Sequence, residues 1–190
     1  MSEIICVTHR RLCPDDFLTR MRRIVAAHPR AVILREKDLT APEYEALARQ
    51  LLPLCRAEGV PLLLNGHPLA AAKLGCGAHL PFMRREELLC GGISVHTPEE
   101  ARGARQSAAR YLIAGHIWDT GCKAGLAGRG TDFLREVVQS AEGLPVYAIG
   151  GVTPERMPAV LAAGAAGACV MSSLMTHPDP AAYLAALSRV

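Results

Sequence analysis

The sequence predicts a closed (β/α)8 barrel, and two observations carry this prediction. Eight short apolar runs recur along the chain, and each is followed by a segment with a helical pattern. The runs are continuously apolar rather than alternating, as strands are when helices cover both faces of a parallel sheet. An open doubly wound sheet is the alternative, but open sheets of this size usually use fewer strands. We therefore expect residues 1–190 to form a single domain, a small example of a fold that typically takes about 250 residues.

The first four units each begin with a clear apolar run. The expected strands are IICVTH (4–9), AVILR (31–35), VPLLLN (60–65) and GAHL (77–80), and the helices after them begin near Pro14, Thr40, His67 and Arg84. The second helix has the strongest signals: Thr40 as N-cap, Pro42 in the first turn and Glu43 at the capping-box position. Its apolar positions keep a helical period until Gly59.

The last four units follow the same order. The expected strands are GISVH (92–96), RYLIAGH (110–116), LPVYAIGG (144–151) and AGACVMS (166–172), with helices after Thr97, over 131–141, after Thr153 and over 179–187. The sixth unit differs, because GHIWDTGCKAGLAGRG (115–130) separates its strand from its helix. This segment has no usable hydrophobic period, so we expect a long, flexible, polar loop.

Composition excludes several classes of protein. Half of the residues are hydrophobic and 21% are charged, as in a globular protein. A net charge of +3, without a Lys/Arg run or clustered aromatic residues, gives no support for nucleic-acid binding. No apolar run approaches the length of a membrane span, and the N-terminus MSEIICVTHR does not have the pattern of a signal peptide. We therefore expect neither nucleic acid nor a membrane as a partner.

The seven cysteines indicate a reducing compartment. Their number is odd and no pair has CxxC spacing, which disfavours a zinc knuckle and a disulfide framework. We therefore expect a cytoplasmic protein. Cys122 lies near Lys123 and Arg129, whose charges could lower the pKa of its thiol, but an incidental cysteine explains it better than a nucleophile.

Polar residues gather where the expected strands end, which is where barrel enzymes place their active sites. Gly150 and Gly151 end the seventh strand, and Met171, Ser172 and Ser173 end the eighth. Loops at these two positions commonly bind phosphate through backbone N–H groups. The alternative is that the glycines form a tight turn and Ser172 caps a helix.

The second strand ends in Arg35, Glu36 and Lys37. Arg35 falls within the apolar pattern and is the better candidate for binding an anion, whereas Lys37 fits a surface position equally well. Asn65, Ser94 and His96 stand at the ends of three further strands and are expected to bind substrate.

His116 is the candidate catalytic residue. An imidazole with a pKa near 6.5 can accept and donate a proton near neutral pH. A histidine satisfied by hydrogen bonds at a strand end is the alternative, and it applies equally to His9, His79 and His96. The strand ends carry no pair of carboxylates and no cluster of metal ligands, so we expect neither a metal nor another cofactor.

With these residues in view, the chain resembles the thiamin phosphate synthase/TenI superfamily over nearly its whole length. The motifs that carry the resemblance, in order, are LREKD (34–38), VPLLLNG (60–66), GAHLP (77–81), ISVHTPEEA (93–101), PVYAIGGVTPE (145–155) and AAGAAGACVMSSL (162–174). The family fold is a (β/α)8 barrel, in agreement with the count of units above.

The resemblance separates two subgroups. Thiamin phosphate synthases use Mg²⁺ and carry Asn-Asp after the third strand and an acid after the fourth, where this chain has Asn65-Gly66 and Arg84. The loop is similar instead to that of TenI-type thiazole tautomerases, which carry Gly-His and then Cys-Lys-x-Gly-Leu-x-Gly-Arg-Gly. Gly115-His116 and residues 122–130 match that pattern.

The resemblance therefore implies a thiazole tautomerase, a metal-independent isomerase of thiamin biosynthesis. His116 would be the acid/base that converts a thiazole carboxylate phosphate into its aromatic tautomer, under a mobile loop in which Lys123 supports the phosphate. Two alternatives stay open: a magnesium-dependent thiamin phosphate synthase with relocated metal ligands, and a non-catalytic regulator that binds thiazole phosphate. The expected partner is a phosphorylated thiazole, and the sequence leaves a homodimer open.

Overall fold

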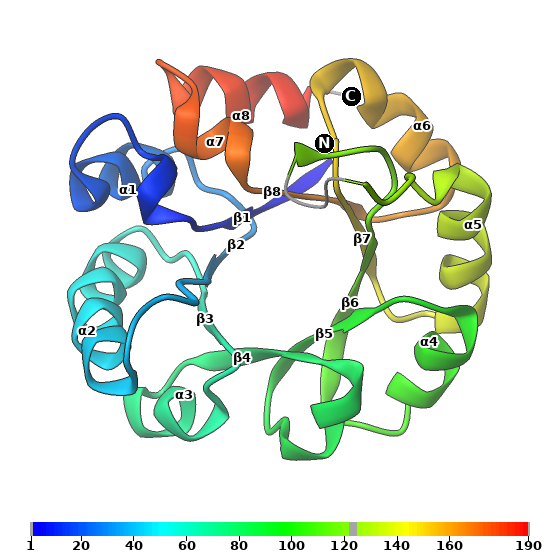
Figure 1. The fold of residues 1–190 in the computed structure, drawn as a ribbon, viewed down its shortest axis with the longest axis horizontal. Coiled ribbons are helices and arrows are strands. Elements are labelled where there is room, and N and C mark those ends of the chain that lie inside the picture. The colour runs from blue at the N-terminus through cyan, green and yellow to red at the C-terminus, as the bar shows by residue number, and fades with distance from the viewer. Residues whose placement is uncertain (1, 122–124, 190) are drawn as a thin grey trace.

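Eight parallel strands close into a barrel in the computed structural model, which describes residues 2–121 and 125–189. Each strand pairs with the next along the chain, and β8 returns to β1 (Figure 1). The strands are β1 Glu3–Val7, β2 Ala31–Leu34, β3 Leu62–Asn65, β4 Gly77–Pro81, β5 Gly91–Val95, β6 Ala109–Gly115, β7 Val146–Ile149 and β8 Gly167–Val170. The predicted (β/α)8 barrel is confirmed.

Helices surround the strands on the outside of the barrel (Figure 1). They are α1 Phe17–Val25, α2 Ala41–Ala57, α3 Pro68–Leu74, α4 Pro98–Ala104, α5 Gly130–Ala141, α6 Met157–Ala162, α7 Ser172–Thr176 and α8 Pro180–Ser188, with 3-10 helices η1 Arg10–Leu12, η2 Phe82–Glu87 and η4 Pro154–Arg156. The helix expected after the fourth strand is the 3-10 helix η2. The short element η1 was not predicted, and α7 was expected only in the alternative in which Ser172 caps a helix, because three to five residues carry too little periodicity. None of the described helices is long and apolar enough to cross a membrane.

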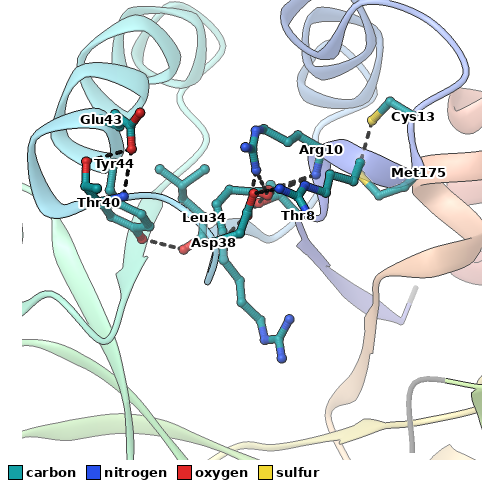
Figure 2. Close-up of polar contacts among 12 residues, drawn as sticks. Thr8, Arg10, Cys13, Leu34, Asp38, Thr40, Glu43, Tyr44 and Met175 are labelled. Atoms are coloured by element: carbon teal, nitrogen blue, oxygen red, sulfur yellow. Dashed lines mark hydrogen bonds and ion pairs between the residues drawn. The ribbon is translucent and has the colours of Figure 1, made fainter.

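The helix starts follow from local capping chemistry. Asp16 precedes α1 and accepts a hydrogen bond from the backbone N–H of Thr19 at 2.8 Å. Thr40 precedes α2, and its backbone N–H donates to Oε2 of Glu43 at 2.8 Å (Figure 2). These bonds satisfy groups that a helix terminus would otherwise leave without partners. The predicted capping box of α2 is confirmed.

Two apolar layers explain why the strands read as continuous apolar runs. The barrel interior contains Ile5, Val7, Ala31, Ile33, Leu63, Ile113, Tyr147 and Cys169. The alternate strand residues, such as Ile4 and Cys6 of β1, pack outward in the larger core that the helices share. Because successive side chains point to opposite faces, a strand buried on both faces needs apolar residues at every position.

Candidate functional site

A cavity of about 640 Å³ opens at the carboxyl ends of the strands. Its lining brings together nearly all of the residues that the sequence analysis selected. They are Arg35, Lys37, Asn65, Ser94, His96, His116, Gly150, Gly151, Met171, Ser172 and Ser173. Lys123 and Cys122 lie outside the described residues. His79 and Arg84 also line the cavity, although the sequence analysis left the first open and assigned the second to a helix.

His116 follows directly after β6 and is 7% exposed. Its Nε2 lies 3.2 Å from the carbonyl oxygen of Leu126. Because a carbonyl oxygen only accepts, Nε2 carries a proton in this conformation. The backbone N–H of Ile117 donates to Ile149 at 2.9 Å, which continues the β6–β7 pairing past His116 and fixes its backbone.

The described part of the loop after β6 folds back onto the barrel mouth. The backbone N–H of Arg129 donates to the carbonyl of His116 at 3.1 Å, and its guanidinium donates to the carbonyl of His96. The backbone N–H of Gly128 donates to Oδ1 of Asp119 at 2.6 Å. The guanidinium of Arg129 also stacks 3.7 Å from the ring centre of Phe133. The far end of the loop is therefore anchored beside His116.

After β2, successive side chains point to opposite sides, which separates the charge of Glu36 from those of Arg35 and Lys37. Arg35 and Lys37 line the cavity, whereas Glu36 is 3% exposed and turns away from it. Glu36 accepts hydrogen bonds from the Thr8 hydroxyl at 2.7 Å and the Arg10 backbone N–H at 3.0 Å. The Thr8 hydroxyl also accepts from the backbone N–H of Arg35 at 2.9 Å. This buried network fixes the backbone that carries Arg35.

Tyr44 of α2 connects the ends of β2 and β3. Its hydroxyl donates to the carbonyl of Leu34 at 2.5 Å and accepts from the backbone N–H of Asn65 at 3.0 Å (Figure 2 shows the first of these bonds). Its ring stacks on His67 with 4.0 Å between the ring centres. Burial raises the pKa of the Tyr44 hydroxyl, so it stays protonated and keeps donating. Tyr44 therefore bridges the backbone of Leu34, next to Arg35, and that of Asn65.

Arg84 brings a third positive charge to the cavity. Its guanidinium pairs with Glu87 through two bonds of 2.7 and 2.6 Å and donates to the carbonyl of Gly66 at 3.0 Å. With Arg35 and Lys37, it makes one side of the cavity cationic. The described residues that line the cavity include neither Asp nor Glu. The site is therefore suited to an anionic ligand.

His79 and Ser94 lie on β4 and β5, beneath the cavity mouth. Nε2 of His79 lies 2.7 Å from the Ser94 hydroxyl, and Nδ1 lies 3.1 Å from the Tyr111 hydroxyl. Burial lowers the pKa of His79 to about 3, so its imidazole is neutral. A neutral imidazole with both nitrogens engaged is a hydrogen-bonding group here rather than a proton carrier.

The segments after β7 and β8 form the opposite side. Gly150 and Gly151 have φ angles of +99° and +65°, and residues other than glycine rarely adopt these backbone conformations. Ser172 and Ser173 begin α7. Arg20 is 1% exposed and holds that helix from its other end, donating to the carbonyls of Leu174 at 3.1 Å and His177 at 2.9 Å.

Taken together, the cavity offers the imidazoles of His79, His96 and His116, hydroxyl and backbone donors after β7 and β8, and the cationic side chains of Arg35, Lys37 and Arg84. This set of groups can bind a ligand that carries a negative charge at each end, and an imidazole can move a proton from one atom of that ligand to another. Within the described residues, no group of three His, Cys, Asp or Glu side chains is placed to hold a metal ion.

Comparison with known proteins gives one consistent result. Residues 4–174 match the TMP-TENI family, described as thiamine monophosphate synthase. The chain is 36% identical over 171 residues to the thiamine-phosphate synthase of Thermus thermophilus, an alignment that covers 86% of this chain and 83% of that one. It is 38% identical over 167 residues to the thiamine-phosphate synthase of Geobacillus thermodenitrificans, covering 81% and 76%.

Solved structures agree with this result. The thiamine phosphate pyrophosphorylase of Pyrococcus furiosus superposes with a TM-score of 0.84 and 26% identity, covering 97% of this chain and 93% of that one. A 3-hexulose-6-phosphate synthase superposes with a TM-score of 0.66 at 17% identity, a likeness of fold alone.

Proposed function

The chain belongs to the thiamine monophosphate synthase (TMP-TENI) family, and we propose that within this family it is a thiazole tautomerase of thiamin biosynthesis. One observation carries the proposal: His116 lines a cavity with three cationic side chains, and the described lining has no carboxylate. The reaction moves a proton from one carbon to another within a substrate that carries a phosphate and a carboxylate. It needs one acid/base and two anion sites.

His116 would perform the proton transfer. A single imidazole can remove a proton from the ring carbon and return it to the exocyclic carbon, so that no proton is gained or lost overall. The bond between Nε2 and Leu126 shows that the loop carbonyl already contacts this ring. A ligand that reached Nε2 would displace Leu126 and remove the contact that keeps the proton on Nε2, so that in the Nδ1–H tautomer Nε2 can act as the base.

The two anionic groups would bind at opposite sides of the cavity. Phosphate fits between the glycines after β7 and the serines after β8, where the positive φ angles of Gly150 and Gly151 let the backbone approach closely. The carboxylate fits the side formed by Arg35, Lys37 and Arg84. The role of Lys123 in holding the phosphate is part of the same proposal.

The residues present do not fit the magnesium ion of the synthase reaction. Magnesium prefers carboxylate oxygens, and the described lining supplies none. Asn65 is followed by Gly66, and Arg84 stands where the resemblance calls for an acid. Arg84 at that position is paired with Glu87 and offers no oxygen ligand to a divalent cation.

A second candidate function is that of a thiamin phosphate synthase, and the names of the curated relatives favour it. The two functions differ in their substrates. A synthase joins a pyrimidine diphosphate to thiazole phosphate, whereas a tautomerase needs only the thiazole carboxylate phosphate.

The test follows conversion of the exocyclic-alkene tautomer into the aromatic thiazole by proton NMR, without added metal. We expect turnover by the wild type and a loss of about 10²–10⁴-fold in His116→Gln. His28→Asn is the matched control, since His28 is a surface histidine whose side chain is 65% exposed. Full activity in His116→Gln would contradict the proposal. So would formation of thiamin phosphate when both precursors and Mg²⁺ are supplied.

A further inference from the structure

Three side chains form a hydrogen-bonded line that descends from the cavity into the barrel. Ser94 and His79 line the cavity, and Tyr111 of β6 lies below them and is not among the lining residues. The Ser94 hydroxyl is 2.7 Å from Nε2 of His79, and the Tyr111 hydroxyl is 3.1 Å from Nδ1 of the same ring. The rings of His79 and Tyr111 stack with 5.7 Å between their centres.

The ring of Tyr111 is tightly packed against its neighbours. A Cβ on Gly92 would stand 2.1 Å from Cζ of Tyr111, so the ring occupies the space that a side chain at position 92 would need. The β5–β6 register also shifts beside Gly92. The ring meets Tyr147 edge-on, with 5.6 Å between ring centres. The Tyr111 hydroxyl therefore has little freedom to turn away from His79.

The protonation states of both rings follow from burial. Burial raises the pKa of Tyr111 well above 10, and it lowers that of His79 to about 3. The phenol therefore keeps its proton and the imidazole has only one. Within the described part of the chain, Nδ1 of His79 is the one hydrogen-bond partner of the Tyr111 hydroxyl.

These constraints fix which group donates and which accepts in the two hydrogen bonds that join Tyr111, His79 and Ser94. If Tyr111 donates to Nδ1, the imidazole proton sits on Nε2 and is donated to the Ser94 oxygen. The proton of Ser94 is then free to point into the cavity. In the reverse direction Nδ1 would donate to Tyr111, and the phenol proton would have no acceptor among the hydrogen bonds of the described residues.

We infer that Tyr111 is a positioning residue that fixes His79 as the Nε2–H tautomer, so that Ser94 presents its hydroxyl as a donor to an acceptor atom on the ring of the bound ligand. The inference rests on the proposed function for the ligand class, a phosphorylated heteroaromatic ring with a nitrogen or carboxylate acceptor. The tautomer itself is a property of the free protein. A ligand whose ring offered only donors at that point would be rejected.

The first test needs no ligand. Long-range proton–nitrogen correlation spectra of protein containing ¹⁵N-labelled histidine report which ring nitrogen carries the proton. We expect His79 to be the Nε2–H tautomer in the wild type, unchanged between about pH 5 and pH 8, and to become a mixture of tautomers in Tyr111→Phe. An Nδ1–H or cationic His79 in the wild type would overturn the inference. So would an unchanged tautomer in Tyr111→Phe, which would make Tyr111 a packing residue only.

The second test measures binding of thiazole phosphate by calorimetry, which does not depend on turnover. Ser94→Ala and Tyr111→Phe should each weaken binding by about tenfold, and the double variant should bind no worse than Ser94→Ala, because both changes remove the same hydrogen bond. Tyr147→Phe is the matched control: it removes another interior hydroxyl, one that bonds to Glu3, and should leave affinity unchanged.

The outcomes separate the two proposals. Absence of isomerisation together with the expected tautomer and binding losses would reject the tautomerase and keep the positioning role of Tyr111. Additive losses in the double variant would overturn the positioning role whatever the reaction, because they would show that Tyr111 acts independently of Ser94.

Discussion

A Cβ placed on Gly150 would stand 2.4 Å from Cβ of His116. Only glycine at position 150 therefore allows the end of β7 to lie this close to His116. The φ angle of Gly150, +99°, adds a second reason for glycine at this position.

Replacing Gly150 with alanine is expected to displace His116. The new methyl group cannot be accommodated without a backbone shift, and misplacement of a reacting group by about 1 Å can cost roughly 100-fold in rate. We expect kcat for isomerisation to fall by about that factor. Gly143→Ala is the matched control, because Gly143 has a φ angle of +96° with nothing within 4 Å of the added atom. Equal effects of the two substitutions would show that backbone strain, and not the contact with His116, is responsible.

Thr8→Val is expected to destabilise the protein by about 1–3 kcal/mol. The Thr8 hydroxyl donates to Glu36 and accepts from the backbone N–H of Arg35, so its removal leaves a buried carboxylate and a partly buried N–H with fewer partners. Urea unfolding gives the change in free energy, with Thr19→Val, on the exposed face of α1, as the comparison. Because Arg35 loses a restraint, KM should also rise. A stability equal to that of Thr19→Val would argue against the network.

His79 predicts a distinct dependence of stability on pH. Its pKa is lowered from 6.5 to about 3 in the folded protein. Between these values the unfolded chain binds a proton that the folded chain does not, so stability falls as the pH falls from 6.5 towards 3. Relative to His79→Gln, the free energy of unfolding of the wild type should fall by about 1.4 kcal/mol for each unit by which the pH is lowered across most of this window. Urea unfolding of both proteins at several pH values measures the difference, and parallel curves would contradict the expectation.

Arg20→Met is expected to loosen α7 from its C-terminal end. The substitution leaves the carbonyls of Leu174 and His177 without their donor and removes the 2.6 Å pair between Arg20 and Asp15. We expect a loss of about 2–4 kcal/mol in the free energy of unfolding and weaker binding of thiazole phosphate. Arg22→Met controls for the loss of charge, because Arg22 lies on the exposed face of α1, the helix that carries Arg20. Unchanged affinity in Arg20→Met would show that α7 does not depend on this anchor.

The sequence by itself determined the order of strands and helices. Apolar runs such as AVIL and the capping residues Thr40 and Glu43 act over a few neighbouring positions, so their effect can be read without knowledge of the fold. Because a parallel barrel gathers its strand ends at one mouth, the sequence also indicated which residues would meet there, among them Arg35 and His116.

Only the tertiary structure decided which neighbours face the cavity and which side chains they contact. Glu36 turns into a buried network between two residues that line the cavity, because side chains alternate along the chain and a shift of one position exchanges the two faces. The pairing of Tyr111 with His79 joins residues 32 positions apart. Arg84 reaches the cavity through the turn after β4, and α7 is fixed by Arg20 from the far end of the chain. These contacts join residues that lie far apart in the sequence, so no local pattern in the sequence encodes them.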